Sequence, residues 1–482
     1  MTQDFRTFLE KLEAAGELRV VTAEVDPKWE AGAISRRGFD LRSPAMLFEN
    51  LKGYARGMRL AANFMGPTRP VPQGRLAIAL GLPKDTPIVE LIEETRKRLR
   101  RRIEPTRIDK RDALCKQVIR TGDQVNLLEF PAPVIHGTDG GPYIGTWHVN
   151  VTRDPDNRIM NWGMYRHMVH DKTKLGWWAA PGQHGMAHYL QKYCPRKEPM
   201  PIAIAIGTDP WSAIIAGSQV PRDVWEAEVV GGILGEPVQL VPCETVDLEV
   251  PAHAEIVIEG WVYPDERMPE GEFGEYTGYT SGGIRPRPVI HVSCITHRKN
   301  PILTMSNMGK PWDEYHVMAS ITLSALTANE LEDRGINFKT VYSPPPITSF
   351  IVSVNPPYPR YAHVLASALW SLKAGIYRPY IFIVDEDVDV TNLEDVFWCV
   401  TTRLHPKNGI DIQAHTPATQ LWPFLDREER DNFVGSKVLF DATFPKSWPE
   451  SEIPTIINFE RAWPEEIQRK VLERWSEYGL GK

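Results

Sequence analysis

The chain has 482 residues, of which 42% are hydrophobic and 24% charged, which is typical of a globular protein with two or three domains. Its net charge of -7 argues against a surface for nucleic acid, and no stretch of eighteen apolar residues predicts a membrane span. The five cysteines form no Cys-x-x-Cys pair and the N-terminus shows no apolar leader, so we expect a cytoplasmic protein without a disulfide framework or zinc ribbon.

Residues 1–115 are predicted to form a small N-terminal α/β region. An amphipathic helix opens the region and ends at Gly16, and its apolar face comprises Phe5, Phe8, Leu9 and Leu12. Strands are predicted at 18–21 and 45–48. A charged helix closes the region and contains the basic run 96–102 (RKRLRRR), which we interpret as a solvated helix face, with a phosphate-binding patch as the alternative.

Residues 116–310 differ from the N-terminal region in composition and predicted secondary structure. Proline and glycine are frequent, and short β-rich runs alternate with turns. The clearest runs are 202–206 (IAIAI), 238–241 (VQLV) and 255–258 (EIVI). Short strands at close spacing, separated by turn signals, are typical of a β-barrel or a β-sandwich. We therefore expect a mainly β central region.

A linker helix is predicted at 311–332, and residues 333–482 are predicted to form a C-terminal α/β domain. The domain contains a buried-strand signal at 380–384 (YIFIV) between helical segments. The last helix opens at Pro464 and has one apolar stripe, formed by Ile467, Val471, Leu472 and Trp475. This helix either completes the domain or packs on a second subunit.

The common signatures of three enzyme classes are missing from the sequence. It has no G-x-x-x-x-G-K-[ST] loop, no strand-borne G-x-G-x-x-G, no G-x-S-x-G elbow and no H-E-x-x-H helix. P-loop NTPases, serine hydrolases and zincins are therefore disfavoured.

One concentration of reactive side chains lies at 269–279 (PEGEFGEYTGY), where Glu270, Glu272 and Glu275 stand among glycines and aromatic residues. Glycine allows close approach of the backbone to a ligand, and aromatic neighbours lower the local dielectric. Carboxylates in such a place are expected to have shifted pKa values and to transfer protons. The alternative is an acidic surface loop.

A second concentration lies at 161–171 (NWGMYRHMVHD) and continues at 181–184 (PGQH). Asn, Gln and His are hydrogen-bonding or metal-binding groups, and Arg166 can bind a carboxylate through two parallel hydrogen bonds. Three further histidines nearby are equally well explained as buried core residues, namely His167, His170 and His188.

Taken together, these segments resemble the UbiD family of prenylated-flavin-dependent decarboxylases, including its ferulic acid decarboxylase branch. The resemblance runs in order along nearly the whole chain. Besides the two segments above, the matching motifs are GGPYI (140–144), WEAEVVGGILGEPVQLV (225–241), PAHAEIVIEG (251–260), DEYH (313–316), LKAG (372–375), VDEDVDV (384–390), TTR (401–403) and GSKVLFDAT (435–443).

The resemblance implies a mixed α+β fold with a central flavin-binding split β-barrel. A small N-terminal α/β part and a C-terminal α/β domain would flank the barrel, and the C-terminal domain would form the subunit contacts of a homodimer or a dimer-based hexamer. The implied cofactor is prenylated FMN, supplied by a flavin prenyltransferase.

The resemblance also implies a divalent metal, Mn²⁺ or Mg²⁺, with K⁺ as a further candidate cation. Asn161, His184 and Glu226 match the metal ligands, and this oxygen-rich set suits manganese or magnesium better than a thiolate-binding metal. The metal would tie the flavin phosphate to the protein. The residues matched to cofactor contacts are these three ligands together with Arg166, Gln183 and Lys373.

Arg166, Glu270 and Glu275 match the catalytic trio of the family. Arg166 would orient the substrate carboxylate and, with Glu270, set the charge state of the site. Glu275 would donate the proton after carbon dioxide leaves, so a raised pKa is expected for it. No ordinary side chain absorbs the electron pair that decarboxylation leaves behind, and the modified flavin would serve as the electron sink.

The implied reaction is reversible, non-oxidative decarboxylation of an aromatic, heteroaromatic or α,β-unsaturated carboxylic acid. The residues expected to shape the pocket for this small-molecule substrate are Trp177, Trp178, Ala180 and His316. Two alternatives remain open, namely a polyprenyl-hydroxybenzoate decarboxylase of the ubiquinone pathway and a flavin-binding reductase or carrier without lyase activity. The chain departs from the family at 216–219 (AGSQ) and at Glu272, which stands where proline is frequent.

Overall fold

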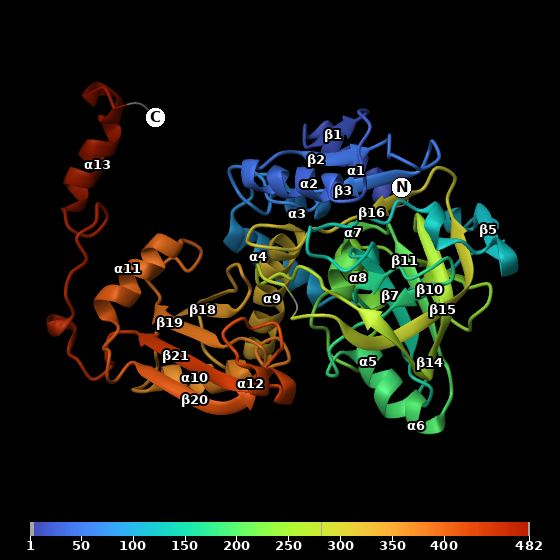
Figure 1. The fold of residues 1–482 in the computed structure, drawn as a ribbon. Helices are drawn as coiled ribbons and strands as arrows, with labels where there is room; N and C mark the ends of the chain where they lie inside the picture. Colours follow the sequence, from blue (N-terminus) through green and yellow to red (C-terminus); the bar gives the residue numbers. More distant parts are fainter. Residues whose placement is uncertain (1–3, 281, 481–482) are drawn as a thin grey trace.

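The computed structural model describes residues 4–280 and 282–480. It has a mixed α/β architecture in which helices surround several separate sheets (Figure 1). The N-terminal and central parts of the chain lie on one side of the long helix α9 (Glu314–Asp333), and the C-terminal part lies on the other. Within these residues, none of the helices combines the length and the apolar composition required of a membrane span.

The N-terminal sheet has the strand order β1-β2-β3-β16. Its members are β1 (Leu18–Val21), β2 (Ala45–Phe48), β3 (Arg59–Ala62) and β16 (Ile302–Thr304). β1 and β2 coincide with the two strands predicted from the sequence. β16 comes from far along the chain and pairs in parallel with β3, so this sheet joins the N-terminal and central parts.

The N-terminal part contains the helices α1 (Phe5–Ala14), α2 (Glu30–Leu41), α3 (Gly74–Ala79) and α4 (Ile88–Leu99), of which α4 packs against α9. The predicted amphipathic helix is α1, whose apolar face is buried and whose first turn is capped by Asp4. The basic run lies at the end of α4 and just beyond it. Arg96 and Arg100 pair with Glu332, on α9, so these arginines hold two helices together and do not form a free basic patch.

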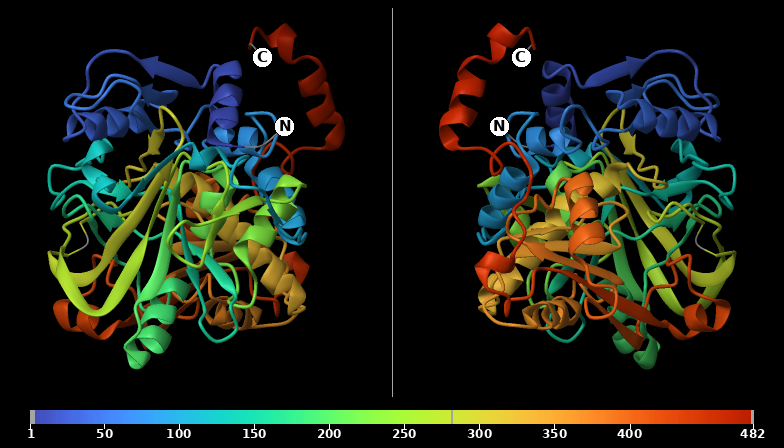
Figure 2. Two further views of the ribbon diagram at one scale, coloured as in Figure 1. Left: turned by 90° about the vertical axis from the view of Figure 1, so that its right-hand side faces the viewer. Right: turned by 90° about the vertical axis from the view of Figure 1, so that its left-hand side faces the viewer.

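The central sheet follows the order β10-β15-β14-β11-β7-β8, and β5 pairs with β15 beside this path. Its strands are β5 (Val118–Thr121), β7 (His148–Arg153), β8 (Met160–Gly163), β10 (Lys174–Gly176), β11 (Met200–Ile206), β14 (Ile256–Glu270) and β15 (Arg285–His297). β14 and β15 form a long antiparallel hairpin that crosses the whole region (Figure 2). The described strands do not close into a complete barrel, because β8 and β10 remain at opposite edges.

Smaller elements complete the central part. Two minor sheets contain β4 (Thr106–Arg107), β12 (Gln239–Pro242) and β13 (Glu249–Pro251), and β6 (Tyr143–Gly145) and β9 (His167–Met168). The helices are α5 (His184–His188), α6 (Cys194–Arg196), α7 (Pro210–Ala216) and α8 (Glu226–Leu234). The three β-rich runs predicted from the sequence overlap β11, β12 and β14.

The C-terminal sheet has the order β17-β18-β19-β21-β20 and is parallel at its centre. It contains β17 (Thr340–Tyr342), β18 (Ser349–Val354), β19 (Tyr380–Asp385), β20 (Ile410–Pro417) and β21 (Val434–Ala442), with helices α10 (Tyr361–Ser371), α11 (Leu393–Arg403) and α12 (Arg427–Asn432). β19 contains the predicted buried strand. Its burial at the centre of the sheet explains the continuous apolar run in the sequence.

The last helix, α13 (Glu465–Glu473), begins after Pro464 as predicted. It stands away from the rest of the protein at the end of an extended segment (Figures 1 and 2). None of its residues is buried, and Leu472 is 63% exposed. Trp475 lies just beyond it, in a short 3-10 turn, and is also exposed. Ile467 and Leu472 of the apolar stripe are therefore exposed and are not packed into the C-terminal domain.

Candidate active site

Three side chains that are distant in sequence meet at the end of the β14–β15 hairpin. Arg166 precedes β9, Glu270 is the last residue of β14, and Glu275 follows in the next loop. Nε and Nη2 of Arg166 donate to the two carboxylate oxygens of Glu270 at 2.8 and 2.9 Å, and Nη1 donates to Glu275 at 2.6 Å. The structure thus brings the predicted trio together as one buried ion-pair network.

The backbone of the glutamate loop is shaped by glycine. Gly271 has a φ of +100°, a conformation that other residues rarely adopt, and a Cβ atom on Gly140 would lie 1.8 Å from the Gly271 carbonyl oxygen. The Glu272 carboxylate accepts hydrogen bonds from the backbone N–H groups of Phe273 and Gly283, at 3.2 and 2.6 Å. Glu272, for which the sequence indicated no role, therefore ties the two ends of the loop together.

Burial controls the charge state of the trio. Glu270 is 1% exposed and Glu275 is 9% exposed. Burial raises the pKa of Glu275 to about 7, against the lowering effect of Arg166. Burial alone would lower the pKa of Arg166, but the charges of Glu275 and Glu270 outweigh it and raise that pKa. The site therefore holds a permanently charged arginine beside a carboxyl group that titrates near neutrality.

The three residues matched to metal ligands also converge. Asn161 lies on β8, whereas His184 and Glu226 are the first residues of α5 and α8. Nδ1 of His184 lies 2.9 Å from Oδ1 of Asn161 and 3.8 Å from Oε1 of Glu226, and all three side chains are buried. Two helix N-termini add positive potential to this point, which favours a phosphate.

This donor set fits a hard divalent cation, because its amide oxygen, carboxylate oxygen and imidazole nitrogen converge without a thiolate. The second oxygen of Glu226 accepts the backbone N–H of Trp162 at 2.9 Å, which holds the carboxylate in place. No group of three or more His, Cys, Asp or Glu side chains elsewhere in the described chain forms a metal site. The asparagine is therefore essential to the candidate centre.

Lys373 approaches the same point from the C-terminal part of the chain. Its Nζ donates to Nε2 of His184 at 2.7 Å and also contacts the carbonyl oxygen of Val220. Burial lowers the pKa of Lys373 to about 8. These contacts differ from those of a freely solvated surface lysine.

A cavity of about 430 Å³ lies beside the trio, between the central and C-terminal parts. The residues of the central part that line it include Arg166, Trp178, Ala180, Gln183, Phe273 and Glu275. The C-terminal part contributes Tyr377, Arg378, Ala418 and Phe433. Its aromatic and apolar walls suit a flat ring, and its polar groups are concentrated at the trio.

Two residues expected in the pocket lie elsewhere, and these expectations are corrected. Trp177 is fully buried and packs against Tyr165 and Tyr189, at ring distances of 6.1 and 5.6 Å. Adjacent residues in an extended segment point to opposite faces, so only Trp178 of the pair faces the cavity.

His316 is also fully buried and is absent from the cavity lining. Its Nε2 lies 2.7 Å from the carbonyl oxygen of Tyr276, and its Nδ1 lies 2.8 Å from Oδ1 of Asp313. It joins the start of α9 to the glutamate loop and does not reach the ring-binding space. His167 is fully buried within the core, as its alternative explanation predicted.

Sequence reasoning missed several residues of the site. The hydroxyl of Tyr143 donates to Oε1 of Glu270 at 3.1 Å, and the Arg166 guanidinium lies 5.2 Å from the Phe273 ring centroid. Both residues stand inside quoted motifs, which was an available signal. Tyr377, Arg378 and Phe433 carried no such signal, because only the packing of the C-terminal part brings them to the cavity.

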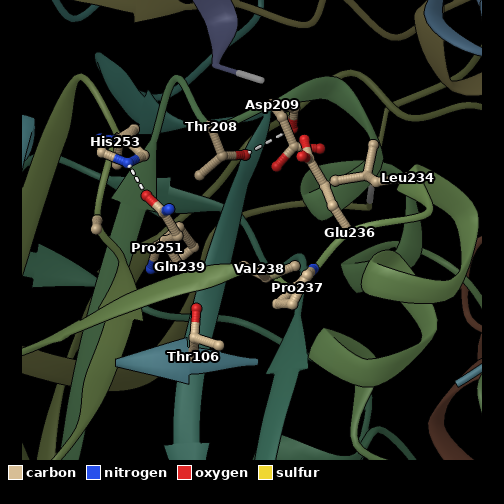
Figure 3. Close-up of a pocket in the computed structure, with 12 residues that line it drawn as sticks. Thr106, Thr208, Asp209, Leu234, Glu236, Pro237, Val238, Gln239, Pro251 and His253 are labelled. Atoms are coloured by element: carbon tan, nitrogen blue, oxygen red, sulfur yellow. Dashed lines mark hydrogen bonds between the residues drawn. The ribbon is translucent and has the colours of Figure 1, made fainter. Parts of the chain in front are cut away.

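A separate cavity of about 310 Å³ lies between α8 and the β12–β13 pair (Figure 3). Several of its polar groups are already engaged. Nε2 of His253 lies 2.6 Å from Oε1 of Gln239, and Asp209 caps α7 by accepting the Ser212 N–H at 3.0 Å. The cavity beside the trio is therefore the better candidate for chemistry.

Comparisons with known proteins agree along the whole chain. Models of the 3-octaprenyl-4-hydroxybenzoate carboxy-lyase N-terminal, Rift-related and C-terminal domains match residues 9–95, 106–311 and 316–442. The pyrrole-2-carboxylic acid decarboxylase of Pseudomonas aeruginosa is 31% identical over 99% of this chain and 98% of its own. The phenolic acid decarboxylase of Bacillus subtilis is 35% identical, covering 92% of this chain and 93% of its own.

Solved structures show the same relationship. The closed form of the vanillic acid decarboxylase of Sedimentibacter hydroxybenzoicus superposes with a TM-score of 0.90 at 31% identity, covering 98% of this chain and 99% of its own. The UbiD-class enzyme HmfF from Pelotomaculum thermopropionicum, in complex with FMN, has a TM-score of 0.81 at 28% identity, covering 94% and 97%. With all three domain models matched, this chain is a member of the UbiD family of carboxy-lyases.

Proposed function

We propose that the protein catalyses the reversible, non-oxidative decarboxylation of an aromatic or heteroaromatic carboxylic acid with prenylated FMN. The observation that carries the proposal is the buried Glu270–Arg166–Glu275 network beside a cavity with aromatic and apolar walls. The named activities of the relatives, on pyrrole-2-carboxylic, phenolic and vanillic acids, support a single-ring substrate.

Asn161, His184 and Glu226 would hold Mn²⁺ or Mg²⁺, and Gln183 and Lys373 would contact the flavin. Their convergence supports this assignment, because a cation at this point would balance both Glu226 and a flavin phosphate. K⁺ is a second candidate cation. When bound, the prenylated flavin would supply the electron sink that the reaction requires.

The residues of the chain would handle charge and protons. Arg166 uses three of its five N–H groups on the two glutamates, and so holds both Glu270 and Glu275 in place. Its two remaining N–H groups can orient the substrate carboxylate. As the carbon–carbon bond breaks and carbon dioxide leaves, Glu275 would deliver a proton to the ring carbon. A pKa of about 7 leaves enough of Glu275 protonated for this step at neutral pH.

We also propose that the central sheet acts as a split barrel around the flavin. The long β14–β15 hairpin supports this arrangement, because it carries the glutamate loop to the edge of the sheet that faces the C-terminal part. In this scheme residues 1–115, 116–310 and 333–482 are the functional units, joined by the helix at 311–332. A flavin prenyltransferase would supply the cofactor.

The cavity helps to choose among the alternatives. A polyprenyl-hydroxybenzoate decarboxylase needs an apolar channel for a long tail, whereas the lining of this cavity combines apolar walls with the charged groups of Arg166, Glu275 and Arg378. A flavin-binding reductase or carrier without lyase activity has no use for a buried arginine between two glutamates. We therefore favour the aromatic acid decarboxylase.

Dependence on the modified cofactor tests the proposal. We expect protein produced together with a flavin prenyltransferase to release carbon dioxide from at least one acid in a panel of pyrrole carboxylates, hydroxybenzoates and cinnamates. Protein produced without the prenyltransferase should bind little flavin or plain flavin and release none, because no side chain here absorbs the electron pair. The measurements are the absorption spectrum and carbon dioxide release for both preparations. Turnover by flavin-free protein would refute the proposal.

We propose, further, that the C-terminal domain forms the contacts of a homodimer or a dimer-based hexamer, and that α13 packs on a second copy of the chain. Exposed Ile467 and Leu472 on a helix that stands apart support this assignment. Leu472→Asp should shift the protein to a smaller species in light scattering, because burial of an unpaired carboxylate is unfavourable. Glu473→Lys, which changes the charge on the side of α13 opposite the stripe, is the matched control and should leave the assembly intact. Equal masses for all three proteins would contradict the assignment.

A further inference from the structure

A second cavity, of about 840 Å³, lies where the tip of the β14–β15 hairpin meets α12. The charged residues that line it are Arg285, Arg287, Arg427, Arg430 and Asp431. Four guanidinium groups therefore face one carboxylate. Asp431 lies 3.3 Å from Arg285 and 3.9 Å from Arg427, so these two arginines share its charge. Arg287 and Arg430 remain without a carboxylate in the described part of the chain.

Arg287 is the most unusual of these residues. Its guanidinium carbon lies 3.3 Å from the centroid of the Trp178 ring, and its Nε is buried. Within residues 4–280 and 282–480 it has neither a hydrogen-bond acceptor for its side chain nor a salt bridge. Burial lowers the pKa of Arg287 to about 10, and the charge of Glu270 opposes this shift. A half-buried, unpaired cation of this kind is costly unless an anion joins it.

The arginine cavity and the substrate cavity share a wall. Trp178, on which Arg287 stacks, lines the substrate cavity. On the other side, Leu425 of the arginine cavity packs with Ala418 of the substrate cavity. The strand register places Arg285 opposite Glu270 and Arg287 two residues further along, so both arginines share a face of the hairpin with the catalytic carboxylate.

The proposed substrate needs a cation that Arg166 does not fully provide. Arg166 is bound to Glu270 on one edge and to Glu275 on its remaining terminal nitrogen. A carboxylate that enters the cavity therefore meets two acidic groups whose charge is balanced by one arginine. Arg287 lies one tryptophan ring away, and because its Nε is buried, an anion would bind the N–H groups on its two terminal nitrogens.

We propose that Arg287, supported by Arg430, forms an anion-binding site at the entrance of the substrate cavity and captures the carboxylate of the incoming organic acid. The site selects an acid over its neutral amide before the ring passes Trp178. This inference rests on the proposed function for the identity of the substrate.

The test uses two probes that bind without reacting, added to the enzyme loaded with its cofactor. Cyclohexanecarboxylate and cyclohexanecarboxamide share one ring, only the first is charged, and neither has the unsaturated carbon that the reaction requires. We expect Arg287→Met to bind the carboxylate ~10- to 100-fold more weakly than the wild type, with unchanged affinity for the amide, in titration calorimetry. Arg287→Lys keeps the positive charge but lacks the planar guanidinium group. Its affinity for the carboxylate should therefore lie between those of the wild type and Arg287→Met.

Arg120→Met is the matched control. It removes the same charge from β5, which pairs with β15 in the same sheet but lines neither cavity, so it should bind both probes like the wild type. The melting temperature of Arg287→Met should not fall, because methionine replaces an unpaired charge. A lower melting temperature with equal loss of both probes would indicate a structural role and overturn the proposal.

Three other results would distinguish a site for the substrate carboxylate from a site for inorganic anions and from failure of the proposed reaction. Unchanged carboxylate binding by Arg287→Met overturns the proposal. Binding of sulfate that depends on Arg287, at matched ionic strength and without carboxylate binding, shows a site for inorganic anions and also overturns it. If no acid in the panel releases carbon dioxide while carboxylate binding still depends on Arg287, the proposed reaction fails and the anion site stands.

Discussion

Replacing Glu275 by glutamine is expected to lower the rate of decarboxylation by about 100- to 10,000-fold, the usual contribution of general acid catalysis. Glutamine keeps the shape of the side chain and can still accept a hydrogen bond from Arg166, but it has no acidic proton to deliver. Substrate affinity should change little, because Arg166 remains tied to Glu270 through two hydrogen bonds. The measurement is carbon dioxide release under single-turnover conditions, with flavin content equalised.

Incorporation of solvent deuterium into the product carbon should fall in step with the rate. Glu272→Gln is the matched control, because Glu272 belongs to the same loop and its carboxylate bonds to backbone N–H groups. It should reduce activity far less than Glu275→Gln. If Glu275→Gln decarboxylates and exchanges deuterium at the wild-type rate, the proton donor lies elsewhere in the cavity.

The pH dependence of the reaction follows from the same residue. A donor must be protonated, so activity should be highest below the Glu275 pKa of about 7 and should fall as pH rises through that value. The charged groups that act on Glu275 are Arg166, which lowers its pKa, and Glu270 and Glu272, which raise it. Glu270→Gln removes one of the negative charges that raise the pKa of Glu275. The loss of activity at high pH should therefore begin at a lower pH in this variant. It should also change the flavin spectrum, which Glu272→Gln should not.

The second large effect is expected at the candidate metal centre. Glu226→Gln retains the size of the side chain and its bond to the Trp162 N–H, but it removes the only charge among the three matched ligands. Loss of groups that merely support a metal ligand often costs 10- to 100-fold in affinity. Loss of the ligand charge itself should lower metal affinity by at least about 100-fold, and flavin content should fall with it.

Metal per chain by elemental analysis and flavin by absorbance are the two measurements, and circular dichroism monitors the fold. Glu228→Gln provides the control, because Glu228 also lies in the first turn of α8 but is not among the matched ligands. It should retain both metal and flavin. Full metal and flavin content in Glu226→Gln would show that the cation binds elsewhere.

Local sequence patterns determined much of the architecture. The spacing of Phe5, Phe8 and Leu12 predicted α1, and the apolar run at 380–384 predicted β19, because a helix or strand must bury the side chains of one face. The motif at 269–279 placed Glu270, Glu272 and Glu275 on a single short loop, and the resemblance to the family selected Glu270 and Glu275 among them. These features depend on residues that are close in sequence.

Packing between distant segments decided the rest. Arg166 is 104 residues from Glu270, and the two meet only because β14 carries the loop back beside β9. The sequence predicted that both Trp177 and Trp178 line the substrate pocket. Because adjacent side chains of an extended segment point to opposite faces, Trp177 lies in the core and only Trp178 faces the cavity. The C-terminal lining of the cavity and the arginine cluster at its entrance arise where two regions pack together. Such contacts depend on how whole elements are arranged, and the spacing of residues along the chain does not encode them.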